Sequence, residues 1–192
     1  MSSISVLDVR TAEDWDRWLD EHHASVPEGV WLRLFKKDHR DEGALEYAEA
    51  VELALCFGWI DGQGKGYDET SRLQRFTPRR SGSVWSKVNT ERAERLIQAG
   101  RMRAAGMREV DAATSDGRWE KAYDPPSTAV VPEDFLAELR RNKKAAKFFA
   151  TLNKRNTYPV TYRLQTAKTP ETRAKRNKAM IEMFERGEKF YD

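Results

Sequence analysis

The sequence has a single cysteine, Cys56, among its 192 residues, so it cannot form an internal disulfide. Chains of this kind are typical of a reducing compartment. Long apolar runs are also missing, because the run at residues 53–57 is far shorter than the roughly 20 residues that a membrane-spanning helix needs. The N-terminus lacks a basic segment followed by an apolar one, so no secretory signal peptide is expected. Together, these absences predict a cytoplasmic protein without a membrane span.

Recognised metal-binding and catalytic motifs are equally scarce. The three histidines, His22, His23 and His39, do not have a metal-ligand spacing with one another or with Cys56. The cysteine follows Leu55 in an apolar stretch, where a buried, unreactive thiol is the usual state. The glycine-rich run at 62–66 lacks the Gly-Lys-Ser/Thr ending of a phosphate-binding loop. We therefore predict no metal and no cofactor, and we assign no catalytic residue from a motif.

Charge is distributed unevenly along the chain. Overall, 34 Lys and Arg residues oppose 31 Asp and Glu residues, for a net charge of +3. Residues 143–178 hold 11 Lys and Arg residues and one acid, Glu171, whereas the rest of the chain holds 23 bases and 30 acids. Such a basic segment attracts nucleic acid, anionic lipid or an acidic protein surface, although a solvated helical face has the same composition.

The N-terminal part is predicted to combine helices with a small sheet. Hydrophobic periodicity indicates helices over residues 12–22, 47–58 and 104–115. Another helix carries Val88, Ala93, Leu96 and Ile97 and stops at Gly100, with capping side chains available at 83–89. Residues 30–35 and 72–77 are rich in β-branched and aromatic residues or alternate in polarity, which predicts two strands. Residues 59–66 contain too much glycine for a regular element.

The C-terminal part is predicted to be all helix. Residues 125–128 (PPST) form the clearest linker, which predicts a boundary between units 1–125 and 126–192. Helices are expected from Pro132, from Asn142, from Pro159 and from Thr169, the last with Asn177 on an otherwise apolar stripe. The fold class is therefore α+β and mostly helical, with a small antiparallel sheet in the N-terminal unit.

A ligand site is predicted from arginines that alternate with aromatic residues. Residues 70–90 contain four arginines and a lysine but no acid. A guanidinium group can bind an oxyanion through two hydrogen bonds while an indole ring stacks on a flat molecule. This pattern favours an anionic small ligand, although the same rings can simply fill the core. The candidate binding residues are Trp59, Asp61, Arg75, Arg79, Ser83, Trp85 and Asn89.

Two other functions compete with ligand binding. The basic C-terminal helices predict a module that binds nucleic acid or an acidic protein. Its candidate residues are Lys143, Lys144, Lys147, Lys154, Arg155, Arg173, Lys175 and Arg176. An enzyme with Asp61 as general base and Ser83 or Ser86 as its polar partner is the least favoured of the three.

Several separated motifs resemble the YdeI/OmpD-associated (OmdA, bacteriocin-protection) family. They are ALCFGWIDG at 54–62, RFTPR at 75–79, SVWSKVN at 83–89, LIQAGRM at 96–102 with Ala105 and Gly106, and the basic run at 167–176. The resemblance implies an uncharacterised protein associated with stress or bacteriocin resistance. It implies no reaction, so no family catalytic residue can be transferred to this chain.

Overall fold

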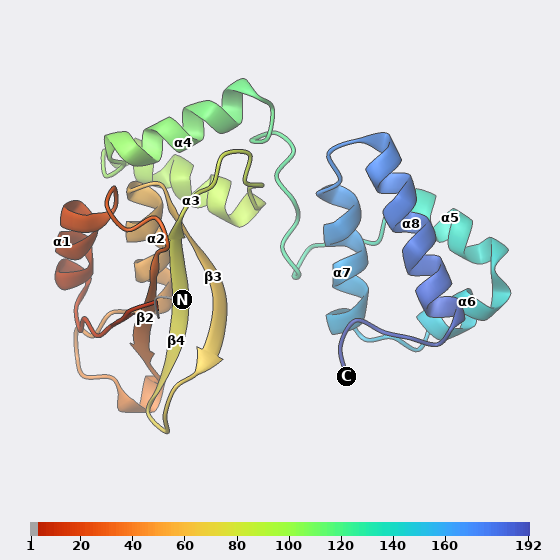
Figure 1. Ribbon diagram of the computed structural model, residues 1–192, viewed down its shortest axis with the longest axis horizontal. Coiled ribbons are helices and arrows are strands. Elements are labelled where there is room, and N and C mark those ends of the chain that lie inside the picture. The colour runs from red at the N-terminus through yellow and green to blue at the C-terminus, as the bar shows by residue number, and fades with distance from the viewer. Residues whose placement is uncertain (1–3) are drawn as a thin grey trace. The chain divides into compact units, whose positions relative to one another are not determined.

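The computed structural model describes residues 4–192 and divides into two compact units (Figure 1). The N-terminal unit contains the residues up to Ser83 together with Asn89–Glu120, and the C-terminal unit contains Val84–Val88 and Lys121–Asp192. The short segment Val84–Val88 belongs to the second unit because Tyr123 pairs with it. The Tyr123 amide donates to the carbonyl of Trp85, and its carbonyl accepts from the amide of Lys87, both at 2.9 Å.

The helices of the N-terminal unit lie where the hydrophobic periodicity predicts them. They are α1 (Ala12–His22), α2 (Tyr47–Cys56), α3 (Lys87–Gln98) and α4 (Ala104–Ser115), with a short 3-10 turn at Lys37–His39. Thr11 caps α1, because its hydroxyl accepts a hydrogen bond from the amide of Asp14 at 3.2 Å. Gly100 ends α3 with a φ of 64°, a left-handed conformation that glycine adopts without strain.

The sheet is mixed rather than purely antiparallel. It contains β1 (Val6–Leu7), β2 (Val30–Phe35), β3 (Trp59–Gly66) and β4 (Ser71–Pro78), in the order β1-β2-β4-β3. The two predicted strands, β2 and β4, do pair antiparallel, as do β4 and β3. The strand β1 adds a parallel edge that the sequence analysis missed, because two residues are too few to show any periodicity.

The prediction that residues 59–66 lack regular structure is wrong. They form the edge strand β3, paired to β4 on both sides of a bulge between Asp61 and Gly64. Glycine weakens a strand, but the ladder to β4 and a side-chain bond compensate for it. At the bulge, the Gln74 side chain donates from Nε2 to the carbonyl of Gly62 at 2.8 Å.

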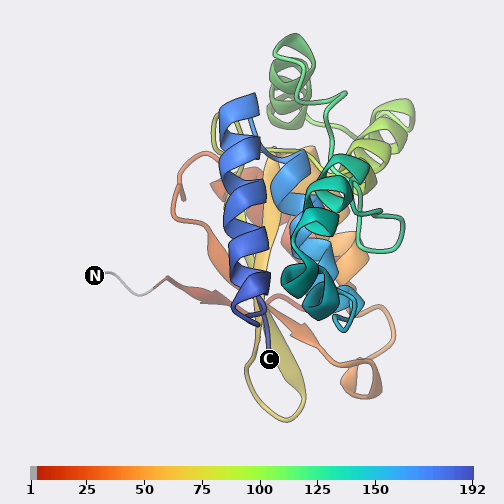
Figure 2. The same cartoon turned by 90° about the vertical axis from the view of Figure 1, so that its right-hand side faces the viewer.

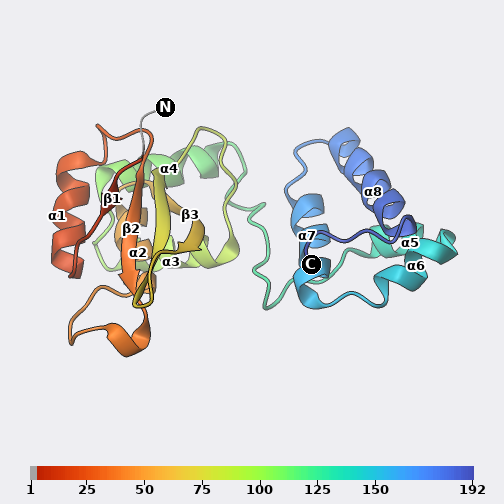
Figure 3. The ribbon, with the colours of Figure 1, turned by 60° about the horizontal axis from the view of Figure 1, so that its bottom comes forward.

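The core of the N-terminal unit lies between one face of the sheet and its helices (Figure 3). Along β2, three buried residues, Val30, Leu32 and Leu34, alternate with half-buried ones, so β2 turns one face inward. From α1, Trp15 places its ring 5.4 Å from that of Phe76 on β4. Its indole Nε1 also donates to the carbonyl of Ala50 on α2 at 3.1 Å, which ties the two helices together.

The C-terminal unit is helical, as predicted (Figure 2). It contains α5 (Glu133–Arg141), α6 (Lys143–Phe149), α7 (Lys154–Gln165) and α8 (Pro170–Glu185). The predicted caps are confirmed, because the side chains of Asn142 and Thr169 accept from the amides of Ala145 and Thr172. Its buried core consists of Phe135, Leu139, Ala145, Val160, Leu164, Met180 and Phe184.

The helix α7 does not begin at the proline as predicted. Its cap is Asn153, whose side chain accepts from the amide of Asn156, and Pro159 lies inside the helix. Proline is tolerated there although it lacks the N–H that would bond to the carbonyl of Arg155. On α8, Asn177 is buried within the inward stripe. Within residues 4–192, no helix has the length and apolar character needed to cross a bilayer.

Candidate functional sites

The two tryptophans of the predicted ligand site are both buried. Trp59 is 1% exposed and its indole Nε1 donates to the carbonyl of His23 at 3.1 Å, whereas Trp85 is 2% exposed. Trp59 belongs to the N-terminal unit and Trp85 to the C-terminal one. Each ring therefore contributes to packing, and neither presents an open face to solvent.

Two charged members of the predicted site, Asp61 and Arg75, lie on the sheet, and the third, Arg79, directly follows β4. Asp61 on β3 accepts a 2.6 Å hydrogen bond from the hydroxyl of Tyr47, and the pKa of that phenol is raised mainly by burial and further by this bond. Arg75 on β4 donates to the carbonyl of Glu28 and places its guanidinium 5.6 Å from the Trp31 ring. Burial lowers the pKa of this guanidinium. Arg79 is buried, and its amide donates to the carbonyl of Gly58 at 2.9 Å.

The remaining members lie outside the sheet. The carbonyl of Ser83 accepts from Arg118 at 2.7 Å, and the Asn89 side chain accepts from Arg92 at 3.0 Å. The two cavities described next are lined by other residues. The site at residues 59–89 stays a prediction.

A cavity of about 620 Å³ in the C-terminal unit combines arginines with aromatic rings, which are tyrosines here and not the tryptophans of the site predicted at residues 59–89. We call it the tyrosine–arginine pocket. It is lined by Tyr123, Tyr158, Pro159, Tyr162, Arg163, Thr166, Arg176 and Tyr191. Its volume lies within the range of known small-molecule sites.

The tyrosines come from three separate parts of the chain. Tyr158 and Tyr162 are four residues apart on α7 and so share one face of the helix. Tyr123 meets Tyr162 edge-on, with ring centroids 4.9 Å apart. Tyr191 is held from the tail by Asn156, whose buried side chain donates to the Tyr191 carbonyl at 3.1 Å and accepts from its amide at 2.9 Å.

The charges at this pocket are cationic. Arg176 on α8 donates to the carbonyl of Arg163 at 2.6 Å, at the end of α7 where carbonyl groups lack partners within the helix. Nearby, Asp124 accepts from Lys87 and from Gln165, both at 2.6 Å, and these bonds lower the pKa of its carboxyl group. Among the described residues that line the cavity, none is acidic.

Tyr158 supplies a neutral hydroxyl to the same cavity. Burial raises its pKa to about 12, with smaller contributions from Tyr123, Tyr162 and Asp124. The phenol therefore stays protonated at neutral pH and can donate a hydrogen bond; here it donates to the carbonyl of Asp124 at 3.3 Å.

Sequence reasoning missed this pocket. The spacing of Tyr158 and Tyr162 followed by Arg163 was the one local signal. Tyr123 and Tyr191 are more than 25 residues away from them along the chain, and no pattern in the sequence links such distant positions.

The residues predicted to bind nucleic acid divide into two groups. Arg173 binds Asp134 through two nitrogens and the carbonyl of Leu164 through a third, and Arg155 binds the carbonyl of Asp192. Together with Arg176, these arginines stabilise the fold. The second group consists of exposed lysines, of which Lys154 also donates to the carbonyl of Ser127 at 3.1 Å. These lysines are Lys143, Lys144, Lys147, Lys154 and Lys175.

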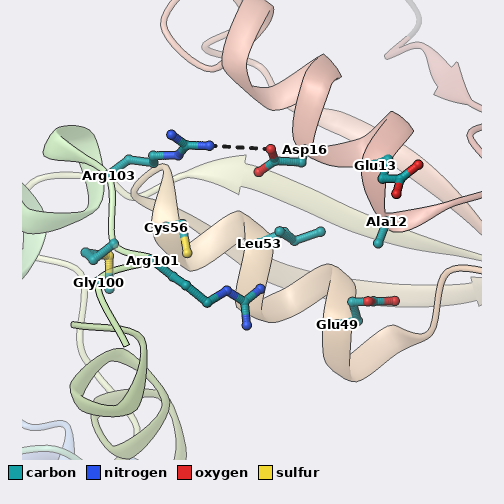
Figure 4. Close-up of a pocket in the computed structure, with 10 residues that line it drawn as sticks. Ala12, Glu13, Asp16, Glu49, Leu53, Cys56, Gly100, Arg101 and Arg103 are labelled. Atoms are coloured by element: carbon teal, nitrogen blue, oxygen red, sulfur yellow. Dashed lines mark ion pairs between the residues drawn. The ribbon is translucent and has the colours of Figure 1, made fainter. Parts of the chain in front are cut away.

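A second cavity, of about 500 Å³, lies in the N-terminal unit (Figure 4). We call it the mixed-charge pocket. Its walls come from α1, from α2 and from the segment between α3 and α4. It is lined by Ala12, Glu13, Asp16, Glu49, Leu53, Cys56, Gly100, Arg101, Met102 and Arg103.

Two different stretches of the chain match two different known families. Residues 7–109, more than half of the chain, match the family described as Domain of unknown function (DUF8412). The chain belongs to the DUF8412 family. Most of the N-terminal motifs quoted above, from 54–62 to 96–102, fall within this DUF8412 region, which also contains the mixed-charge pocket.

Residues 128–187 match the family described as Bacteriocin-protection, YdeI or OmpD-Associated. This match confirms the family resemblance, and it covers the α7 and α8 residues of the tyrosine–arginine pocket. No curated protein and no solved structure matches the chain. The chain therefore combines a DUF8412 region with a YdeI/OmpD-associated segment.

Proposed function

We propose that this protein binds a flat, anionic small molecule in the tyrosine–arginine pocket. The observation that carries the proposal is the convergence of four tyrosines and two arginines on one cavity of about 620 Å³. Phenol rings supply flat surfaces for stacking, and guanidinium groups bind carboxylate or phosphate. The neutral hydroxyl of Tyr158 donates its proton to the carbonyl of Asp124, so its oxygen can accept a hydrogen bond from the ligand.

The charges around the tyrosine–arginine pocket and the fixed position of the Arg176 side chain both favour an anionic ligand. Asp124, whose carbonyl accepts from the lining residue Tyr158, has its carboxylate already neutralised by Lys87. Arg163 and Arg176 therefore set the sign of the local field. The Arg176 guanidinium is also held in place by the carbonyl of Arg163 and the hydroxyl of Thr166, so little side-chain freedom is lost on binding.

Adenosine monophosphate, adenosine and inorganic phosphate test the proposal as a matched series. Thermal shift and calorimetry should detect binding of the monophosphate, which has both a ring and an anion. Each of the other two lacks one of these features and should bind at least about tenfold more weakly. Equal responses to all three, or none, would contradict the proposal.

A matched pair of variants locates the binding. Arg176→Gln removes a lining guanidinium and should weaken binding of the monophosphate about tenfold or more. Lys175→Gln removes the same charge from the neighbouring, exposed position and should leave binding within about twofold. If both variants weaken binding equally, the net charge of the unit and not the pocket is responsible.

We further propose that the protein acts in the cytoplasm and that a role in bacteriocin resistance or stress is indirect, through the bound molecule. In cells that lack the gene, the wild-type chain and Lys175→Gln should then restore bacteriocin resistance, whereas Arg176→Gln should not. Full rescue by Arg176→Gln would show that bacteriocin resistance does not depend on ligand binding in the pocket.

Nucleic-acid binding is the second candidate function. Lys143, Lys144 and Lys147 are all exposed on α6, which contains no acid. Binding by these lysines would weaken steeply with salt, because each neutralised phosphate releases counterions. Titration of a labelled single-stranded oligonucleotide at two salt concentrations, with Lys143→Gln/Lys147→Gln as the comparison, tests this candidate.

A further inference from the structure

The mixed-charge pocket is built by the LIQAGRM and Ala-Gly motifs, which the proposed function leaves unexplained. At the end of α3, the amides of Gly100 and Arg101 donate to the carbonyls of Ile97 and Leu96, both at 2.9 Å. This pair of bonds, with Gly100 in the left-handed conformation, is a Schellman C-cap. The cap turns the chain so that Arg101 and Arg103 face α1 and α2.

A second glycine holds this wall against α2. The amide of Arg103 donates to the carbonyl of Cys56 at 3.2 Å. A Cβ atom at Gly106 would lie 2.5 Å from the Cys56 carbonyl oxygen and 2.6 Å from that of Leu55. Only glycine therefore lets α4 approach the last turn of α2 this closely.

The two ends of the pocket differ in charge. Figure 4 shows the carboxylates of Glu13 and Glu49 at one end and the ion pair of Arg103 with Asp16 at the other, with the Arg101 side chain extending between them. The apolar part of the lining consists of Ala12, Leu53, Cys56 and Met102. Burial raises the pKa of the Cys56 thiol, so this side chain contributes a neutral surface.

The arginines are only loosely paired with protein carboxylates. Arg103 lies 3.5 Å from Asp16, and Arg101 lies 3.7 Å from Glu52, with both arginine side chains about half exposed. Charge-assisted hydrogen bonds are normally 2.7–2.9 Å long, as the 2.7 Å pair of Arg40 with Glu46 illustrates. A ligand carboxylate can therefore improve on the contacts that these guanidinium groups already have.

From this geometry we propose that the mixed-charge pocket binds a small zwitterion, a free amino acid or a dipeptide with an apolar side chain. The ligand carboxylate lies between Arg101 and Arg103, and its ammonium group faces Glu13 and Glu49. The apolar side chain covers Leu53 and Met102. The mixed-charge pocket shares no lining residue with the tyrosine–arginine pocket. A test of this proposal is therefore independent of the proposed function.

Leucine and two analogues that each lack one charge test the proposal on the wild-type protein. Calorimetry or ligand-observed NMR should detect saturable binding of leucine or of leucyl-leucine. Leucinamide lacks the carboxylate, and 4-methylpentanoate lacks the ammonium group. Each should bind at least about tenfold more weakly than leucine, because one set of charged contacts is lost. Absence of saturable zwitterion binding, or equal binding of all three single-residue compounds, overturns the proposal.

Variants then place the ligand. Arg103→Gln should weaken leucine binding about tenfold and leave leucinamide binding unchanged, whereas Glu49→Gln should weaken leucine and leave 4-methylpentanoate unchanged. Arg108→Gln, at an exposed α4 position outside the lining, is the matched control and should have no effect. Leucine binding that survives both lining substitutions overturns the assignment of the pocket. The ligand series on the wild-type protein keeps the test decisive if a variant fails to fold.

Discussion

The two units of this protein contain cavities of similar size that are lined by different kinds of side chain. The described lining of the tyrosine–arginine pocket has aromatic rings and arginines as its only charges, whereas the mixed-charge pocket is lined by both carboxylates and guanidinium groups. The two units also differ in their balance of basic and acidic residues. The N-terminal unit has 17 Lys and Arg against 22 Asp and Glu, and the C-terminal unit has 17 against 9. Two cavities of similar volume therefore present different sets of charges to a ligand.

The largest expected effect comes from removing the centre of the C-terminal core. Phe184 is fully buried, and its ring lies against those of Phe135, Phe149 and Phe190. Phe184→Ala should lower the free energy of unfolding of this unit by about 4 kcal/mol, because a large cavity is left. Urea unfolding and hydrogen exchange measure the loss. The variant should also lose nucleotide binding but keep leucine binding, and the reverse result would break the comparison.

The next effect concerns the wall of the mixed-charge pocket. Gly106→Ala should destabilise the N-terminal unit by about 2–3 kcal/mol, because its Cβ would overlap two carbonyl oxygens of α2. Gly66→Ala is the control, since nothing lies within 4 Å of its added Cβ. The two variants can be compared by urea unfolding followed by tryptophan fluorescence. Equal stability of the two would mean that α4 can move away from α2 without loss.

A smaller effect is expected where the C-terminal tail is held. Asn156→Ala removes both hydrogen bonds to Tyr191 and should destabilise the unit by about 1–2 kcal/mol. Trypsin should then cut faster after Lys189, which mass spectrometry of the released tail detects. Asn156→Asp retains the acceptor for the Tyr191 amide and should give an intermediate rate. A tail that is cut no faster in either variant would show that other contacts hold Tyr191.

The smallest effect depends on pH. Asp124→Asn should reduce stability at pH 7 by about 1 kcal/mol, because the bonds from Lys87 and Gln165 favour the ionised carboxylate. Since its pKa is lowered by folding, the carboxylate stabilises the protein above pH 3.8, and this contribution is lost as the pH falls further. Thermal unfolding of both proteins from pH 7 to pH 3 should show the difference shrinking at the acid end. A difference that is independent of pH would exclude the ionised carboxylate as its cause.

Much of the local structure could be predicted because its causes lie within a few residues. The caps of α1, α6 and α8 depend on Thr11, Asn142 and Thr169, each with a partner amide three residues away. The same local rules failed at Pro159, because the packing of α7 tolerates a proline that propensity alone places at a helix start. They failed at β3 because pairing with β4 outweighs the low strand propensity of glycine.

The location of the tyrosine–arginine pocket could not be predicted from the sequence. The pairing of arginines with aromatic rings that the sequence shows around Trp59 and Trp85 also occurs in this pocket, among other residues. Nothing in the local pattern distinguishes a ring that fills a core from one that lines a cavity. That distinction depends on what packs against the ring from elsewhere in the chain.

The sequence by itself determined most of the helices, the caps of α1, α6 and α8, and the family resemblance of the C-terminal segment, because each depends on short-range periodicity or on a contiguous motif. Only the tertiary structure decided which side chains share a cavity. Tyr123, Tyr162 and Tyr191 meet, as do Asp16 and Arg103, because helix packing brings distant segments together. Such contacts depend on the free energy of the whole unit, and they produce no periodic pattern in the sequence.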